Sequence, residues 1–309
     1  MKNALTICLF CISMLLTAQE SQKRREVKVL KGAIRKSIIP KRDPIPKGWR
    51  SEGKISFLFN QAAFSNWVAG GENSISGTLG LHYDFNYHQK DWDWDNRVIV
   101  AYGLTQTRNS KFTKKTDDRF ELNSVIGKKG RNHWFYSGFL NFRTQITKGF
   151  RYTTNENGKE IRMEHTNAFS PAYVSFGPGV LWKKNDNFKF NIAPGTSKVT
   201  IVDDEFTLPN EEYFGVVEGE SVRYELGMYA SGYCKFPLLN NVIMENVVNL
   251  YSNYLEDPKN VDLDYSVNVV MTINEYLSTT INFQTIYDDN AFKGFQTREV
   301  LGLGVNYVF

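Results

Sequence analysis

The sequence has few cysteines and few histidines, and both shortages exclude functions. Its 309 residues contain three cysteines: Cys8 and Cys11 lie in an early apolar run, and Cys234 is the one that follows it. A chain that loses the early run has one cysteine left and cannot form an intramolecular disulfide. None of the four histidines has a metal-ligand or zinc-protease spacing: His82, His88, His133 and His165. The sequence therefore predicts no cofactor and no bound metal.

Long apolar runs are also missing. After residue 18 no stretch approaches the roughly 18 consecutive apolar residues that a membrane-spanning helix needs. The one early run, residues 4–16, follows Lys2 and ends near Ala18, which predicts a secretory signal peptide over residues 1–18. Cys11 lacks the Leu-small-small lead of a lipoprotein site, so no lipid anchor is expected.

Acidic residues are scarce in the segment that follows. Residues 20–50 carry eleven basic and three acidic side chains and end among three prolines. Such a block is usually a solvated tail, and we interpret residues 19–50 as a basic periplasmic tail. The alternatives are a tether to an anionic periplasmic partner and a plug in an acidic pore. Residues 51–309 carry 25 basic and 30 acidic side chains, so no nucleic-acid partner is expected.

The last twelve residues alternate between apolar and small or polar side chains. Counting back from Phe309 and Tyr307, every second residue is apolar, which is the period of a strand with one apolar face. Soluble domains seldom end on the final residue of such a strand, because free chain ends fray. The ending resembles the C-terminal signal by which outer-membrane β-barrels are recognised for assembly, with Tyr307 and Phe309 as its aromatic residues.

The same alternation recurs along residues 51–309 and predicts an all-β protein. Residues 75–88 give the clearest example, and their fourteen residues exceed a typical globular strand but suit a tilted membrane crossing. We therefore predict an antiparallel up-and-down transmembrane barrel of about twelve strands rather than a soluble sandwich, with the strands at 53–64, 75–88, 92–107, 118–128, 134–148, 171–183, 188–202, 221–236, 242–255, 262–273, 277–287 and 298–309. Pro178 and Pro194 predict that two of these are bent or bulged.

The connections between these strands alternate in length. Short turns at one rim and long loops at the other are typical of outer-membrane barrels, whose turns face the periplasm. Tryptophan, tyrosine and phenylalanine gather near both predicted rims, as interfacial aromatic belts do. These patterns predict the outer membrane of a didermal bacterium, with both chain termini in the periplasm, lipids as surroundings and the barrel-assembly machinery as a partner.

A loop motif after the first strand gives a family resemblance. The segment Trp67-Val-Ala-Gly70-Gly71-Glu-Asn73-Ser74 resembles that of uncharacterised outer-membrane β-barrel proteins that share a Trp-x-x-Gly-Gly-x-Asn-Ser loop. The resemblance covers most of residues 50–309 and implies fold and location but no activity. The loop either fixes strand register, through glycine turns and asparagine hydrogen bonds, or contacts a ligand.

One strand carries the best candidates for catalysis. Ser76, Thr78, His82, Asp84 and His88 share the face predicted to point inward, and a Ser–His–acid arrangement supports hydrolysis. No Gly-x-Ser-x-Gly elbow accompanies them, and a polar lumen contains such residues without catalysis. The hydrolase is therefore the weaker hypothesis, and we predict that the protein is not an enzyme.

Charges of both signs are predicted to line the lumen. They lead to two functions: a narrow channel for small polar solutes, with these charges as its filter, or a non-conducting structural or interaction barrel in which they pair and fill the bore. The lumen-lining candidates are Asp84, Arg97, Arg119, Glu121, Arg143, Arg223, Glu225 and Glu245. We expect the arginines to pair with acids on neighbouring strands.

The predicted loop at residues 203–220 carries seven acidic and no basic side chains. Hard cations bind several carboxylate oxygens, so a divalent cation site is one interpretation. The spacing matches no calcium loop, and a solvated acidic loop is the other interpretation.

Overall fold

A closed β-barrel accounts for almost all of the regular structure. The computed structural model describes residues 47–65, 72–207, 213–290 and 292–309, so the predicted signal peptide, most of the predicted tail and Trp67, Gly70 and Gly71 lie outside the described residues. The strands are β1 (Gly48–Ala62), β2 (Ser74–Gln89), β3 (Trp92–Thr107), β4 (Lys114–Lys129), β5 (Trp134–Thr144), β6 (Gly149–Thr154), β7 (Glu160–Thr166), β8 (Ala172–Asn185), β9 (Phe188–Ile201), β10 (Val222–Leu239), β11 (Val242–Asn253), β12 (Asp262–Thr272), β13 (Leu277–Asp288) and β14 (Phe292–Val308).

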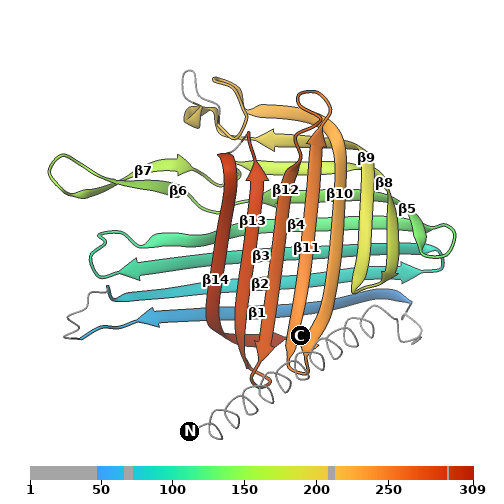
Figure 1. Ribbon diagram of the computed structural model, residues 1–309, viewed down its shortest axis with the longest axis horizontal. Coiled ribbons are helices and arrows are strands. Elements are labelled where there is room, and N and C mark those ends of the chain that lie inside the picture. Colours follow the sequence, from blue (N-terminus) through green and yellow to red (C-terminus); the bar gives the residue numbers. More distant parts are fainter. Residues whose placement is uncertain (1–46, 66–71, 208–212, 291) are drawn as a thin grey trace, which may run out of the picture.

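Twelve of these strands form the barrel, in the order β1-β2-β3-β4-β5-β8-β9-β10-β11-β12-β13-β14 and back to β1. Every neighbouring pair is antiparallel, and Lys54 to Phe59 of β1 pair with Val308 to Leu303 of β14 to close the ring. In Figure 1, β10–β14 cross steeply over β1–β5, as tilted strands on two walls of a barrel do. The predicted fold class and strand number are confirmed.

Several boundaries differ from the predicted ones. β1 begins at Gly48, so Gly48, Trp49 and Arg50 belong to the barrel rather than to the basic tail. Their mixed side chains hide the alternation, but β1 continues to pair with β2 as far as Gly48 and His88. β14 begins at Phe292, six residues before the predicted start. Backbone pairing with the neighbouring strand extends these strands beyond the part that the apolar pattern marks.

Residues 149–170, which the sequence predicts as one long loop, contain a hairpin. β6 and β7 form a separate two-stranded sheet that projects from the barrel in Figure 1. A stack of rings and cations joins this hairpin to the loop before β4: the Arg162 guanidinium lies 4.3 Å from the centroid of Phe150 and 5.0 Å from that of Phe112. Glu160 accepts hydrogen bonds from Ser110 Oγ and the Lys111 backbone N–H, both at 2.9 Å.

The bulge predicted for the proline-containing strands is confirmed. The register between β8 and β9 shifts between Phe176 and Val180, beside Pro178, where proline has no N–H to donate to the ladder. Gly179 allows the two backbones to approach, since a Cβ there would lie 2.5 Å from the carbonyl oxygen of Ile192.

The outer face of the barrel is apolar and the turn-side rim is aromatic. Exposed large apolar side chains lie along the outer face, such as Phe57, Leu79, Leu301, Leu303 and Val305. At the rim with the short turns, Trp49 packs against Tyr87 and Trp94 with ring centroids 5.2 and 5.5 Å apart. A second group there joins Trp134, Trp182 and Phe190. No helix of the described residues is long and apolar enough to span a bilayer.

Candidate functional site in the barrel lumen

The period of two places one residue in every pair inside the barrel, and these side chains enclose a cavity of about 380 Å³. Of the predicted lumen-lining residues, those at the cavity wall are Asp84, Arg97, Arg119, Glu121 and Glu245. Three of the predicted residues do not line the cavity, and each takes part in an ion pair described below: Arg143, Arg223 and Glu225. Five of the eight predicted lumen-lining residues therefore lie at the cavity wall.

An ion pair crosses the middle of the lumen. Arg97 on β3 donates to both carboxylate oxygens of Asp84 on the neighbouring strand, at 2.7 and 3.1 Å. Its Nη1 donates to Glu245 Oε1 at 2.8 Å, and five strands separate β3 from β11 in either direction around the barrel. Tyr233 also donates its hydroxyl to Glu245 Oε1, at 2.7 Å. Arg97 therefore connects opposite walls through charge-assisted hydrogen bonds.

Two further bridges link distant strands nearer the long loops. Arg143 on β5 donates to Asp264 on β12 at 2.7 Å, and Gln284 donates to the other oxygen of that carboxylate at 2.8 Å. Arg298 on β14 donates to Asp117 on β4. The expectation that arginines pair with acids on neighbouring strands is therefore only partly correct, because these partners are on non-adjacent strands.

A third group of charges lies at the turn-side mouth. Lys183 Nζ lies 2.9 Å from Asp95 Oδ1, and Lys189 Nζ lies 2.6 Å from Asp95 Oδ2. In the turn between β8 and β9, Asp186 accepts from Arg50 on β1 at 3.0 Å. Burial alone would raise the pKa of Asp186, but the positive charge of Lys183 and the hydrogen bond from Arg50 hold it below its ordinary value. Paired charges thus line the turn-side mouth.

The remaining predicted arginines have local partners. Arg119 lies 3.9 Å from Glu121 on its own strand, too far for a hydrogen bond. Arg223 contacts Glu256 and lies 3.5 Å from Glu225. Glu225 is 2% exposed and lies 3.2 Å from Lys198 Nζ, so its charge is neutralised inside the protein.

The five candidates for catalysis on β2 are not arranged as a triad. Asp84 is held by Arg97, and His88 pairs with Asp93. Within residues 72–207, no hydrogen bond joins His82 to Ser76, Thr78 or Asp84. The geometry therefore gives the hydrolase hypothesis no support.

The described part of the loop motif positions backbone. Asn73 Oδ1 accepts from the Phe64 N–H at 2.6 Å, and its carbonyl accepts from the Arg108 N–H at 2.9 Å. Ser74 is the first residue of β2 and pairs with Ala62 and Thr107 on the two neighbouring strands. These contacts favour the interpretation that the loop fixes strand register.

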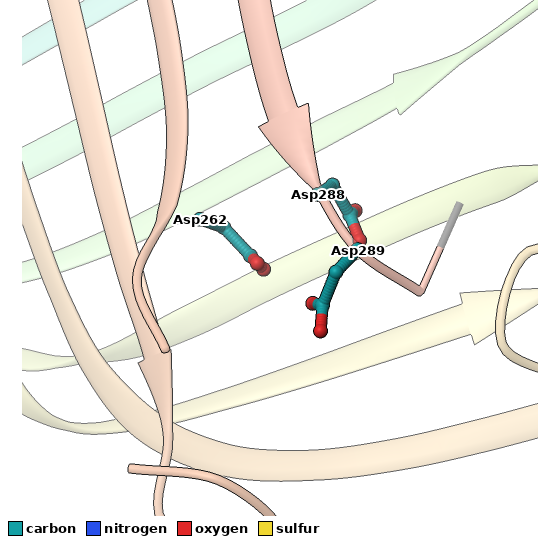
Figure 2. A group of neighbouring side chains, drawn as sticks. All are labelled: Asp262, Asp288 and Asp289. Atoms are coloured by element: carbon teal, nitrogen blue, oxygen red, sulfur yellow. The ribbon is translucent and has the colours of Figure 1, made fainter. Parts of the chain in front are cut away.

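Three carboxylates at the long-loop end of the lumen form the one group with metal-ligand geometry among the described residues. Oxygens of Asp262, Asp288 and Asp289 lie within 4.8 Å of one another, and Figure 2 shows Asp262 facing the other two from a separate strand. Lys198 Nζ lies 3.1 Å from Asp262 and supplies a positive charge at this position. Within the predicted acidic loop, Asp203 instead caps the single-turn helix Asp204–Phe206 by accepting from the Glu205 N–H. Residues 208–212 of that loop lie outside the described residues.

The sequence reasoning missed several residues of the lumen network, among them Lys183, Lys189, Lys198 and Arg298. Arg298 lies at an inward position of a regularly alternating strand, so the alternation would have found it. Lys183 and Lys189 lie in strands whose pattern the bulge near Pro178 interrupts.

Comparison with known proteins gives one family and a set of weakly similar structures. A family of proteins of unknown function (DUF3078) matches residues 59–150, a range that includes the loop motif. No curated protein matches the chain.

Three solved structures with a similar course of the chain have low sequence identity to it. The translocator domain of the autotransporter NalP from Neisseria meningitidis is 10% identical, with 95% of this chain and 97% of that chain covered and a TM-score of 0.39. The β domain of the Bordetella autotransporter BrkA is 9% identical over 85% and 99%, with a TM-score of 0.33. The outer membrane channel DcaP of Acinetobacter baumannii is 11% identical over 84% and 97%, with a TM-score of 0.30. The fold assignment comes from the strand pairing itself.

Proposed function

We propose that this protein is an outer-membrane β-barrel whose lumen passes only small polar solutes. The apolar outer face, the aromatic rim and the closed antiparallel ring support the location, because a barrel in lipid must satisfy every backbone group internally. The turns between strands would face the periplasm together with both termini. Lipids and the assembly machinery are the proposed partners of the outer face and the last strand, and an anionic partner is proposed for the basic tail.

The observation that carries the function is the bridge from Arg97 to Glu245. It joins opposite walls and leaves polar space beside it, in a cavity of about 380 Å³. Such a lumen is too obstructed for an open porin but offers hydrogen bonds along its wall. Paired charges of both signs disfavour a strong preference for one ion sign.

A non-conducting barrel is the second candidate. It is favoured by the number of bridges at different levels, from Arg50–Asp186 at the turn side through Arg97–Glu245 to Arg143–Asp264. If these ion pairs stay formed, they block the lumen and only support the barrel. The outer loops and the projecting hairpin would then be the functional surfaces.

Conductance separates the two candidates. The purified full-length protein is inserted into planar bilayers, and single-channel current is recorded. Bilayers treated with a matched preparation that lacks the protein serve as the control. Small, resolvable steps support the restricted channel. Insertion shown by protease protection, without any current above background, contradicts the channel and favours the non-conducting barrel.

A further inference from the structure

Basic side chains are unevenly distributed around the turn-side rim. Five lie at the turns that join β2 to β3, β4 to β5 and β8 to β9, and we call these five the basic sector: Lys90, Lys128, Lys129, Arg131 and Lys184. The turns between β10 and β11 and between β12 and β13 contain no basic side chain, and their one charged residue is Glu275. Because β2 to β9 are consecutive in the barrel apart from the separate hairpin, the positive charge of this rim lies on one side.

The fold does not neutralise the charges of the basic sector. Among residues 47–65, 72–207, 213–290 and 292–309, no carboxylate lies within ion-pair distance of any of these five side chains. In contrast, Arg50 and Lys183 at the mouth of the lumen both pair with Asp186. Four members of the basic sector are exposed, and Lys184 is half-buried. Their positive charge is therefore free to attract an anionic partner.

Lys128 lies on the outer wall of the barrel rather than in the lumen. Val125 lines the cavity and Ile126 is exposed on the outer face, so the period of two places Lys128 on the side of Ile126. In the register of the sheet, Lys128 lies between Trp92 on β3 and Tyr136 on β5. Its Nζ lies 5.8 Å from the centroid of the Trp92 ring. An ammonium group is thus held at the end of the apolar wall, beside aromatic rings.

The rings around Lys128 are exposed on the same outer wall. Trp92, Trp134 and Tyr136 are 45, 43 and 74% exposed. Tryptophan and tyrosine at the end of a membrane-facing wall lie at the level of the lipid headgroups. Basic side chains at that level attract anionic lipids. An acidic protein would contact the turns, but it would leave these rings and the apolar wall uncovered, so the position of Lys128 favours a lipid as the partner.

We infer that the basic sector binds an anionic phospholipid through its phosphate group. Lys128 contacts the phosphate at the outer wall, and the other four basic side chains add positive charge around it. The acyl chains of the lipid pack along the apolar outer face on the side of Ile126. This inference rests on the proposed function in that it places this rim in a bilayer, but it does not require the lumen to conduct.

Competition between two lipids tests the inference. The full-length protein is purified in an uncharged polyoxyethylene detergent and mixed with equal amounts of phosphatidylglycerol and phosphatidylcholine that carry the same acyl chains. Native mass spectrometry then measures how much of each lipid stays bound.

Two triple variants separate the basic sector from charge in general. The rim variant is Lys128→Gln with Lys129→Gln and Arg131→Gln. The matched control is Arg108→Gln with Lys111→Gln and Lys159→Gln, which removes three exposed positive charges at the long-loop side of the barrel. Heat-modifiable migration on gels verifies that each variant is folded.

The wild type and the control variant should bind phosphatidylglycerol in preference to phosphatidylcholine. The rim variant should lose about fivefold or more of that preference, the effect of one basic side chain near an anionic lipid. Equal binding of the two lipids by the wild type, an unchanged preference in the folded rim variant, or an equal loss in the control variant would overturn the inference. A protein that conducts in bilayers without this lipid preference keeps the proposed function and loses the inference. A protein that has the preference but passes no current does the reverse.

Discussion

The ring of Phe309 lies on Gly53, at the end of the seam where β14 and β1 close the barrel. Their backbones exchange both hydrogen bonds, at 2.8 and 2.9 Å, at the seam between the last residue and β1. A Cβ at Gly53 would lie 2.3 Å from Phe309 Cζ, so only glycine leaves room for the ring. The ring also stacks on Tyr83 and Tyr307, with centroids 6.2 and 6.0 Å away.

Phe309→Ser should lower the amount of assembled barrel, because it removes the ring that covers the seam while the chain still reaches its last backbone bonds. Val308→Ser, one residue earlier on the alternate side of the strand, is the matched control and should assemble normally. Heat-modifiable bands in outer-membrane fractions measure assembly. Equal levels of both variants would show that the ring at position 309 has no special role.

Gly53→Val should impair the same seam from the other side, since its side chain overlaps the position of the Phe309 ring. Overpacking of this kind costs about 1–3 kcal/mol. The double variant Gly53→Val with Phe309→Ala should recover part of that loss, because the ring that clashes is gone. The urea concentration at which the folded gel band disappears reports the change. A double variant weaker than both single ones would contradict the packing argument.

Arg97→Ala should raise conductance and shift selectivity towards cations. It removes the bridge between opposite walls and leaves Asp84 and Glu245 without their shared guanidinium. Arg162→Ala, in the hairpin outside the lumen, is the control and should conduct as the wild type does. Bilayer conductance and reversal potential in a salt gradient give both values. Identical currents for wild type and Arg97→Ala would show that this bridge does not limit the bore.

Acid should weaken the ion pairs of Asp186 at the turn-side mouth. The folded pKa of Asp186 lies below its ordinary value of 3.8, so its charge stabilises the fold fully above that pH and loses its effect as the pH falls through the lowered pKa. Asp186→Asn should therefore be less heat-resistant than wild type at pH 6, and the difference should shrink below about pH 3.8. The temperature at which the folded gel band is lost measures it. A difference that stays constant from pH 6 to pH 3 would contradict the role of the charge.

Removing Arg162 should loosen the projecting hairpin without affecting the barrel. Its guanidinium lies over Phe150 and Phe112, and each such contact contributes about 0.5–1 kcal/mol at an exposed site. Arg162→Ala should be cut faster by chymotrypsin at Phe150 or Tyr152, while the barrel fragment stays intact. Lys159→Ala, at the exposed hairpin turn, is the matched control. Equal cleavage rates would mean that the stack does not hold the hairpin.

The candidates for catalysis on β2 show that residues on one face of a strand need not contact one another. The strand of Ser76, His82 and Asp84 places these side chains on one face, as the alternation predicts. Whether they contact one another depends on competing partners, and Arg97 holds the Asp84 carboxylate from the next strand. The partner cannot be found from the β2 sequence alone.

The amino-acid pattern by itself determined the twelve strands of the barrel and, on the regular strands, which residues share a face, because a period of two follows from strand geometry and needs no tertiary information. It placed Arg97, Glu121 and Glu245 in the lumen and Phe309 at the barrel end. The tertiary structure decided which inward charges meet, because opposition depends on how twelve strands tilt and close. That is why Arg97 meets Glu245 from 148 residues away, which no local pattern records. The tertiary structure also decided the hairpin of β6 and β7, where Arg162 contacts Phe112 from the loop before β4.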